Sequence, residues 1–278
     1  MSPIEADHHT RRYRKVLAIA GSDSGGGAGI QADLKTISAL GCYGMTAITA
    51  LTAQNTLGVH GIHAAPPGFI EDQIEAVLSD MGADAVKIGM LFSPELIEAV
   101  ARQLRKHTVR NIVLDPVMVA QSGDKLLQDE AIEALTALLF PLADVVTPNI
   151  PEASVLLHRK IDGADQIASA ACDIARFGSR SVLVKGGHLQ SGESLDVLYL
   201  TESQRALSLT GERIATSNNH GTGCTLSSAI ASFLALGKNL EEAVRSAKVY
   251  IGEAMSEGAH YRLGKGSGPV HHFYNVWL

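Results

Sequence analysis

The sequence predicts an α/β fold, with a mostly parallel central sheet, helices on both of its faces and an antiparallel edge. Two observations predict it. From residue 16 to residue 184, short apolar runs alternate with amphipathic segments, which is typical of parallel strands joined by crossover helices. Beyond residue 195 the pattern changes to two short runs, Asp196–Leu200 and Ala206–Leu209, around a polar turn. Such a pair favours antiparallel strands.

Each expected element follows from one of two patterns. Strands are expected at short apolar runs: Val16–Ala20, Gly44–Leu51, Ala85–Ile88, Ile112–Leu114, Val145–Val146 and Ser181–Val184. Helices are expected where apolar residues recur every three or four positions, as Ile30, Leu34 and Ile37 do. They are Ala28–Leu40, Phe69–Ser79, Pro94–Arg105, Glu130–Leu139, residues 164–177, Gly223–Leu236 and Leu240–Ala259.

Length and composition favour one domain. A chain of 278 residues, 46% hydrophobic and 19% charged, has ample apolar material for one α/β core, and no repeat or linker divides it. Residues 1–14 are polar and aperiodic, so they are expected to form a disordered N-terminal arm ahead of a single domain, residues 15–278. The net charge of −6, with both signs intermixed, disfavours a nucleic-acid or anionic-membrane partner.

The cysteines and the N-terminus predict a cytoplasmic protein. Cys42, Cys172 and Cys224 are sparse, odd in number and without paired spacing, which suits a reducing compartment. The apolar run behind the basic residues of the arm covers only residues 16–20, too short for a signal peptide, and no stretch reaches the roughly 20 apolar residues that cross a bilayer.

Glycines and polar residues follow five of the expected strands. Open α/β sheets bind ligands outside the carboxyl ends of their strands, so these segments predict a ligand site at one rim of the sheet. They are Gly21–Gly29, Gly89-Met90, Asp115-Pro116, Thr147-Pro-Asn149 and Lys185-Gly-Gly-His188.

The glycine-rich segment Gly21–Gly29 leaves two interpretations open, ligand contact through its backbone amides or a plain turn. No Gly-Lys-Ser/Thr closes it as in a Walker A loop. Residues 27–32 match a relaxed dinucleotide fingerprint, but residues 44–55 contain no Asp or Glu to hold a ribose. This absence argues against a nicotinamide oxidoreductase.

Several charged residues also have two readings. Asn149 and Glu152 have the spacing of a helix capping box, and Glu152 could instead, or in addition, help to hold a hydrated Mg²⁺. Lys185 ends an apolar strand, where it either meets a phosphate or extends its charged head to solvent. Asp115 either caps a turn or orders metal-bound water.

The segment Asn219–Cys224, at the start of an expected helix, is the strongest candidate for chemistry. Gly221 and Gly223, on either side of Thr222, let the backbone curl, and the free amides of a helix start form an anion site that can stabilise a phosphoryl group in transfer. The same electropositive position is expected to lower the pKa of Cys224, so that its thiolate accepts a proton from a substrate hydroxyl. The alternative is a small cysteine that packs the helix start.

Taken together, the motifs closely resemble the bacterial hydroxymethylpyrimidine/phosphomethylpyrimidine kinases, over residues 16–270. Each motif is short, but their order and spacing make the resemblance specific. They are Ala20–Asp33, Thr52–Thr56, Lys87–Met90, Asp115–Met118, Ser122–Asp124, Asn149–Glu152, Lys185–His188 and His220–Cys224. Gln121 and Asn219 depart from the family's common residues.

The resemblance implies a three-layer α/β/α ribokinase-like fold and two successive ATP-dependent phosphorylations in thiamine biosynthesis, with Mg²⁺. The acceptors are 4-amino-5-hydroxymethyl-2-methylpyrimidine and then its monophosphate. It places Gly21, Asp33, Gln54 and Met90 around the pyrimidine. It assigns Lys185 and Asn149 to ATP, Asp115 and Glu152 to the metal and its waters, Gly221, Thr222 and Gly223 to the anion hole, and Cys224 to the catalytic base.

Two alternatives remain within the same fold. Pyridoxal phosphorylation is one, as the main or a side activity, and a non-catalytic pyrimidine sensor is the other. The expected partners are the pyrimidine alcohol, ATP and a second copy of the chain in a homodimer, without nucleic acid or membrane.

Overall fold

The computed structural model describes residues 11–118, 127–187 and 193–277, and its nine strands form one sheet in the order β3-β2-β1-β4-β5-β6-β7-β8-β9. The strands are β1 (Lys15–Asp23), β2 (Tyr43–Asn55), β3 (Gly58–Ala64), β4 (Ala85–Ile88), β5 (Ile112–Leu114), β6 (Val145–Val146), β7 (Ser181–Val184), β8 (Glu193–Leu200) and β9 (Arg205–Glu212). The helices are α1 (Gly29–Ala39), α2 (Pro67–Asp80), α3 (Pro94–Lys106), α4 (Asp129–Leu138), α5 (Ile150–Leu156), α6 (Ala164–Ala175), α7 (Thr222–Ala235) and α8 (Leu240–Gly258).

The sheet is parallel in the middle and antiparallel at both edges. Strands β2, β1, β4, β5, β6 and β7 run parallel, and β8 and β9 add the expected antiparallel edge. A second antiparallel pair, β2 with β3, was not predicted. Strand β3 is exposed for nearly its whole length, so no burial pattern marks it in the sequence.

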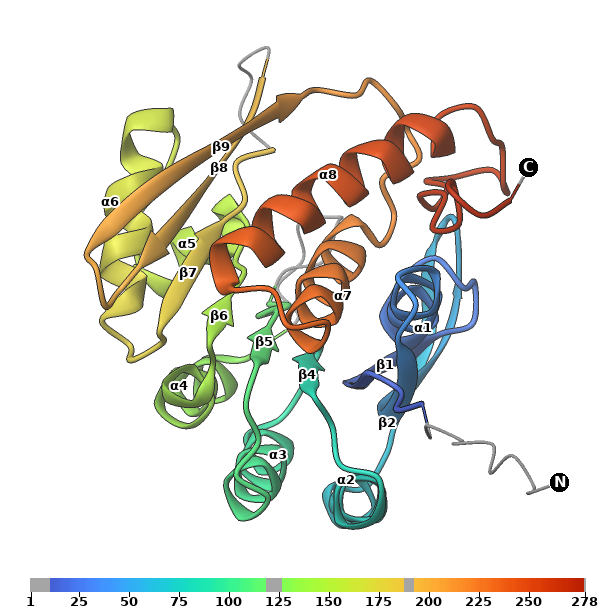
Figure 1. Ribbon diagram of the computed structural model, residues 1–278, viewed down its shortest axis with the longest axis vertical. Coiled ribbons are helices and arrows are strands. Elements are labelled where there is room, and N and C mark those ends of the chain that lie inside the picture. Colours follow the sequence, from blue (N-terminus) through green and yellow to red (C-terminus); the bar gives the residue numbers. More distant parts are fainter. Residues whose placement is uncertain (1–10, 119–126, 188–192, 278) are drawn as a thin grey trace, which may run out of the picture.

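Two layers of helices enclose the sheet (Figure 1). Side chains alternate along β1: Leu17 and Ile19 pack in the core beneath α2–α6, whereas Val16 and Ala18 pack in the core beneath α1, α7 and α8. This alternation follows from the two-residue period of a strand. All of these side chains are fully buried, so β1 is a central strand of a three-layer fold.

The predicted elements are confirmed with small shifts at their ends. Helix α5 starts with the predicted capping box: the Asn149 side chain accepts from the Glu152 N–H at 2.9 Å, and Glu152 accepts from the Asn149 N–H at 2.8 Å. Residues 1–10 of the expected arm, Gln121, the Ser122–Asp124 motif and His188 lie outside the described residues. In the part of the chain that is described, no helix has the length and apolar character needed to cross a bilayer.

Candidate active site

The carboxyl ends of the parallel strands and the start of α7 meet at one rim of the sheet. A Cβ placed on Gly223 would lie 3.3 Å from Lys185 Nζ and 3.4 Å from Asp115 Oδ2. The backbone of Lys185 also forms an isolated parallel β-bridge with that of Asn149. Segments that are far apart in sequence, after β5, β6 and β7, are therefore brought together against the first turn of α7, as predicted from their positions at strand ends.

Asp115 and Lys185 form a nearly buried ion pair. Lys185 Nζ lies 2.9 Å from Asp115 Oδ1, and the Thr147 hydroxyl donates to the same oxygen at 3.1 Å. Burial acts to lower the pKa of Lys185, but Asp115 and Glu152 outweigh it and raise that pKa above its usual value. The Lys185 ammonium is thus charged at neutral pH and lies beside Gly223, in the first turn of α7.

Glu152 is 3% exposed and interacts electrostatically with both members of this ion pair. Burial, with the nearby charge of Asp115, raises the pKa of Glu152 to about 7, although Lys185 opposes the shift. Its carboxylate accepts from the Asn149 N–H at 2.8 Å and from the Met118 N–H at 3.4 Å. Both readings of Glu152 thus remain compatible, because the capping bond leaves the carboxylate at the site.

The carboxylates of Asp115 and Glu152 fit a hydrated Mg²⁺. This ion prefers oxygen ligands and is usually held by one or two carboxylates, with water and substrate phosphates completing its shell. No group of three or more His, Cys, Asp or Glu side chains that could hold a metal occurs among the described residues, so an all-protein cage is not formed there. Burial and, to a smaller extent, the charge of Asp115 disfavour ionised Glu152, and a divalent cation would favour its ionised form.

The α7 turn requires glycine. Gly221 is the N-cap of α7 with φ of +78°, in the left-handed region, and a Cβ there would collide with the carbonyl oxygen of Gly27. Thr222 begins the helix and its hydroxyl donates to the Asn219 carbonyl. The first amides of a helix have no partner within the helix, so this turn presents donors beside Lys185.

The expectation of a lowered pKa for Cys224 is wrong. Burial raises its pKa to about 11; Lys87 opposes the shift, Asp33 and Asp115 add to it, and a hydrogen bond from the Gly29 amide opposes it. The helix start and Lys87 supply positive potential, but desolvation and two carboxylates outweigh them. At neutral pH Cys224 is therefore a thiol in the free protein.

The residues expected around the pyrimidine fall into two groups. A Cβ on Gly21 would touch Met90 Cε at 3.1 Å, and Gln54 Nε2 lies 3.3 Å from His220 Nε2, next to the α7 turn. These three residues line the rim. Asp33 instead lies fully buried beneath it, with both carboxylate oxygens within 2.9 Å of Lys87 Nζ.

The Asp33–Lys87 pair was not singled out as an ion pair by sequence reasoning. The Ser228 hydroxyl also donates to Asp33 Oδ1, at 2.7 Å. Burial raises the pKa of Asp33 despite the attraction of Lys87. The available signal was Lys87 itself, a charged residue inside the four-residue buried strand β4.

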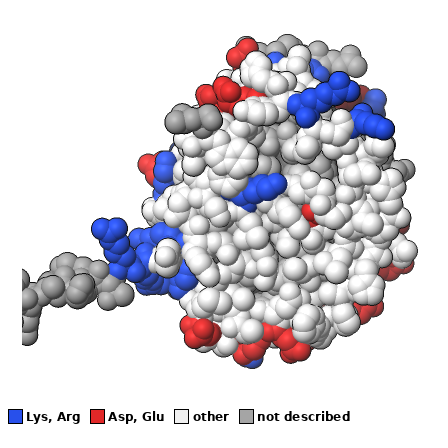
Figure 2. Space-filling model, turned by 90° about the vertical axis from the view of Figure 1, so that its right-hand side faces the viewer, with Lys and Arg blue, Asp and Glu red and all other residues white. Residues whose placement is uncertain are grey.

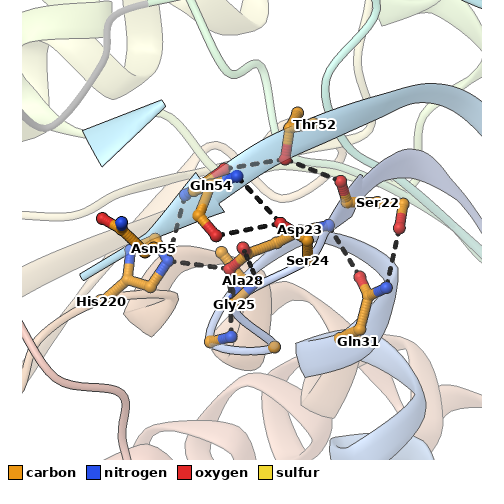
Figure 3. A network of polar contacts seen from close by, with 12 residues as sticks. Ser22, Asp23, Ser24, Gly25, Ala28, Gln31, Thr52, Gln54, Asn55 and His220 are labelled. Atoms are coloured by element: carbon orange, nitrogen blue, oxygen red, sulfur yellow. Dashed lines mark hydrogen bonds and ion pairs between the residues drawn. The ribbon is translucent and has the colours of Figure 1, made fainter. Parts of the chain in front are cut away.

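The glycine-rich loop wraps its amides around its own carboxylate (Figure 3). The amides of Gly25, Gly27 and Ala28 donate to the Asp23 side chain at 2.8, 3.0 and 2.8 Å. Burial acts to raise the pKa of Asp23, but the hydrogen bonds from His220 and from these amides lower it below its usual value. These three amides are used within the loop, which agrees with the interpretation of a plain turn and not with ligand contact through them.

Sequence comparison places the chain among known kinases. A family model described as phosphomethylpyrimidine kinase matches residues 23–271. The hydroxymethylpyrimidine/phosphomethylpyrimidine kinase of Rhizobium meliloti is 51% identical over 262 residues, 94% of this chain and 97% of that protein. A thiamine biosynthesis bifunctional protein of Geobacter sulfurreducens is 51% identical over 257 residues, 92% of this chain and 52% of that protein. The chain thus spans about half the length of the bifunctional relative.

Solved structures agree in fold. The ADP complex of Bacillus subtilis pyridoxal kinase has a TM-score of 0.88 and 38% identity, covering 95% of this chain and 99% of that one. The phosphomethylpyrimidine kinase of Clostridium difficile has a TM-score of 0.76 and 47% identity, covering 86% of this chain and 98% of that one. The predicted three-layer fold is confirmed.

Proposed function

Because this chain belongs to the hydroxymethylpyrimidine/phosphomethylpyrimidine kinase family, we propose that it transfers phosphoryl groups from ATP to 4-amino-5-hydroxymethyl-2-methylpyrimidine and then to the resulting monophosphate. Both steps belong to thiamine biosynthesis. The observation that carries the proposal is the position of Gly223 beside Lys185 and Asp115. A Cβ built on Gly223 would lie within 3.4 Å of Lys185 Nζ and of Asp115 Oδ2.

The phosphate side of the site works by position and charge. Phosphoryl transfer has a loose transition state with its charge on the peripheral oxygens, so most of the catalysis is electrostatic. The Thr222 N–H donates to the Asn219 carbonyl at 3.4 Å, so in this proposal the amides of Gly221 and Gly223 contact the migrating group. Lys185, whose pKa is raised, stays charged against the leaving diphosphate. Asn149 fixes the start of α5 and thereby the place of Glu152 beside the ATP phosphates.

Mg²⁺, when bound, would neutralise the phosphate charge, and Asp115 and Glu152 are the side chains that would hold it or its waters. Carboxylate oxygens suit that role, whereas the Lys185 ammonium has no lone pair to offer a metal. The raised pKa of Glu152, caused mainly by burial and in part by Asp115, supports the assignment, because a nearby cation would favour its ionised form.

On the acceptor side, Cys224 takes the position of the base, Gly21 and Met90 enclose the ring, and Gln54 offers it a donor and an acceptor. Asp33 supports this wall from beneath, since its ion pair with Lys87 and its bond from Ser228 tie α1, β4 and α7 together. With a Cys224 pKa of about 11, only the small deprotonated fraction accepts the hydroxyl proton, so transfer accelerates as pH rises.

The deciding experiment is product detection by mass spectrometry. Incubation with ATP, Mg²⁺ and the pyrimidine alcohol is expected to give the monophosphate first and the diphosphate later, with release of ADP. Release of no ADP with any pyrimidine would leave the sensor alternative and end the kinase proposal.

Pyridoxal is a second acceptor that we propose as a side activity. The supporting observation is the 38% identity and TM-score of 0.88 to a pyridoxal kinase over 95% of this chain. Parallel assays with both alcohols measure the ratio of the two kcat/KM values. A ratio that favours pyridoxal would make it the main substrate.

We also propose a homodimer that is built on the β2–β3 ribbon. Four apolar side chains of this ribbon and its turn, Leu51, Leu57, Val59 and Ile62, are each more than half exposed, and β3 is an edge strand with an open side. Figure 2, which views the right-hand side of Figure 1, shows a broad area with few charged side chains. Light scattering is expected to give a dimer, and I62K is expected to give a monomer.

Two further proposals concern organisation and location. Residues 15–278 form a single domain, supported by the one continuous sheet. The cytoplasm is the proposed compartment, supported by three free cysteines. Limited proteolysis that releases two stable fragments would contradict the first, and an oxidised thiol in protein purified from the cell would contradict the second.

A further inference from the structure

His220 stands between the glycine-rich loop and the ribbon that carries Gln54. Its Nε2 atom lies 2.9 Å from Asp23 Oδ2 and 3.3 Å from Gln54 Nε2 (Figure 3). The ring packs so closely on Gly27 that a Cβ there would overlap it, and the backbone N–H of His220 donates to the Gly268 carbonyl at 3.0 Å. The Gly268 bond fixes the backbone of His220, and the contacts with Gly27 and Asp23 fix its imidazole.

Asp23 determines where His220 carries its proton. The Asp23 carboxylate is 3% exposed and accepts from three loop amides, and these bonds, with that of His220, bring its pKa below the usual value although burial acts to raise it. An ionised carboxylate can only accept. His220 must consequently donate to it, which places a proton on Nε2.

That proton restricts the neighbouring amide of Gln54. On its other side, Gln54 Oε1 lies 3.2 Å from the Thr52 hydroxyl oxygen, and Thr52 donates its single proton to the Ser22 carbonyl at 2.9 Å. His220 therefore offers a donor and Thr52 offers an acceptor. A half-turn of the Gln54 amide about its last torsion exchanges its oxygen and nitrogen without steric cost, and this places the oxygen against His220 and the NH₂ group against Thr52.

The orientation of this amide determines which order of donor and acceptor on a substrate it can pair with. An aminopyrimidine edge presents a ring nitrogen acceptor beside an NH₂ donor, whereas an oxopyrimidine edge presents a ring N–H donor beside a carbonyl acceptor. The two edges have opposite order, and each matches only one of the two amide orientations. A site that satisfies one order leaves polar groups unpaired with the other.

We propose that Asp23 and His220 are positioning residues which, together with Thr52, fix the Gln54 amide in one orientation and so select a 4-aminopyrimidine over its 4-oxo counterpart. The inference rests on the proposed function for the identity of the substrate. The network itself belongs to the free protein, and this allows the two to be tested separately.

The kinetic test compares 4-amino-5-hydroxymethyl-2-methylpyrimidine with the 4-oxo analogue. The wild type is expected to favour the amine. H220F keeps a ring over Gly27 but removes the N–H, and is expected to lower the ratio of the two kcat/KM values by at least about tenfold while KM for ATP is unchanged. T52V acts on the opposite side of the same amide and is expected to lower the ratio by a smaller factor.

S24A is the matched control. Among the described residues, the Ser24 hydroxyl bonds the backbone N–H and carbonyl of Gln54, at 2.8 and 2.9 Å, and not its side-chain amide, so its loss is expected to leave the ratio unchanged. A ratio that falls equally in all three variants would show general loosening of the ribbon and overturn the proposal.

The second test needs no turnover. Nitrogen-15 NMR of the free protein is expected to show His220 with its proton on Nε2 in the wild type and to lose that signal in H220F. A proton on Nδ1 alone would overturn the proposal whatever the activity. If the wild type phosphorylates neither pyrimidine, the proposed function fails, and calorimetric binding of the two compounds then decides the selection: equal affinities overturn it, and tighter binding of the amine supports it.

Discussion

The two halves of the site solve different problems. On the proposed phosphate side, Lys185 pairs with Asp115 and Glu152 lies beside them. Burial raises the pKa of Glu152, whereas the two carboxylates raise the pKa of Lys185 against the effect of burial. On the acceptor side, Gly21, Met90 and Gln54 carry no charge, and their environment is set by packing and by the order of donors and acceptors.

This difference predicts how strongly each half responds to the loss of one interaction. Removing one member of a buried charge cluster leaves the others uncompensated, with a large penalty. Removing one hydrogen bond from a neutral wall has a smaller effect that falls mainly on substrate choice. In the proposed mechanism the turn at Gly221–Cys224 belongs to both halves, since its amides would contact the phosphoryl group and its sulfur the alcohol.

G223V is expected to have the largest effect. The added Cβ would fall 3.3 Å from Lys185 Nζ and 3.4 Å from Asp115 Oδ2, and the larger side chain would displace both from the turn. Loss of anion-hole geometry is expected to lower kcat by about 10³-fold or more, measured by ADP release. Near-normal kcat in a folded G223V protein would separate the turn from the charge cluster and break the comparison.

C224A is expected to lower kcat by about 10²–10³-fold while leaving ATP affinity nearly intact, because it removes the proposed base but no proposed phosphate contact. The pH dependence is the sharper measurement. Only the deprotonated sulfur accepts a proton, so wild-type kcat should rise between pH 7 and pH 10, below the Cys224 pKa of about 11. C224D, whose carboxylate is already ionised across that range, should lose the rise.

A flat wild-type profile would remove Cys224 from the base role. The control is calorimetric titration of ATP into wild type and C224A, where a matching dissociation constant shows that the phosphate side is undisturbed.

The comparison also explains what the sequence could predict. Parallel strands β1, β4, β5 and β7 were visible because each is an apolar run, and the site followed because polar residues succeed those runs at one rim. Lys185 was visible for the same reason, as a charge at the end of the buried strand β7. These features depend on local pattern alone.

Features that depend on tertiary neighbours were missed. The pKa of Cys224 is raised by burial and by Asp33 and Asp115, which come from α1 and from the end of β5. The glycine loop turns inward because a single side chain, Asp23, accepts its amides. Strand β3 has no buried face to mark it. In each case the deciding contact lies outside the segment whose pattern was read.

E152Q sharpens the phosphate half. Glutamine at this position can keep the capping bond to Asn149, so the fold is expected to survive while the charge proposed to hold the metal or its waters is lost. We expect kcat to fall by about 10²-fold, with a higher Mg²⁺ concentration needed for half-maximal rate. A variant with unchanged Mg²⁺ dependence would confine Glu152 to capping α5.

Stability gives an independent reading of the same residue. The pKa of Glu152 is raised from 4.5 to about 7, so the folded state binds its proton more tightly than the unfolded state does. The tighter binding of this proton therefore contributes fully to the free energy of unfolding below about pH 4.5, and the contribution is lost as pH rises to about 7. Without divalent cations at pH 8, E152Q should exceed the wild type in free energy of unfolding by on the order of 2 kcal/mol, and denaturant titration at pH 5 and pH 8 measures the difference.

Q54A is expected to have the smallest effect on turnover and the clearest effect on recognition. The side chain lies on the neutral wall beside His220 and Thr52, away from the charges at Asp115 and Lys185. KM for the pyrimidine should therefore rise by about 10-fold, the loss of one or two hydrogen bonds, while kcat and KM for ATP change little. A fall in kcat as large as that of C224A would mean that Gln54 aligns the hydroxyl with the sulfur. The two halves would then be coupled through the substrate's own orientation.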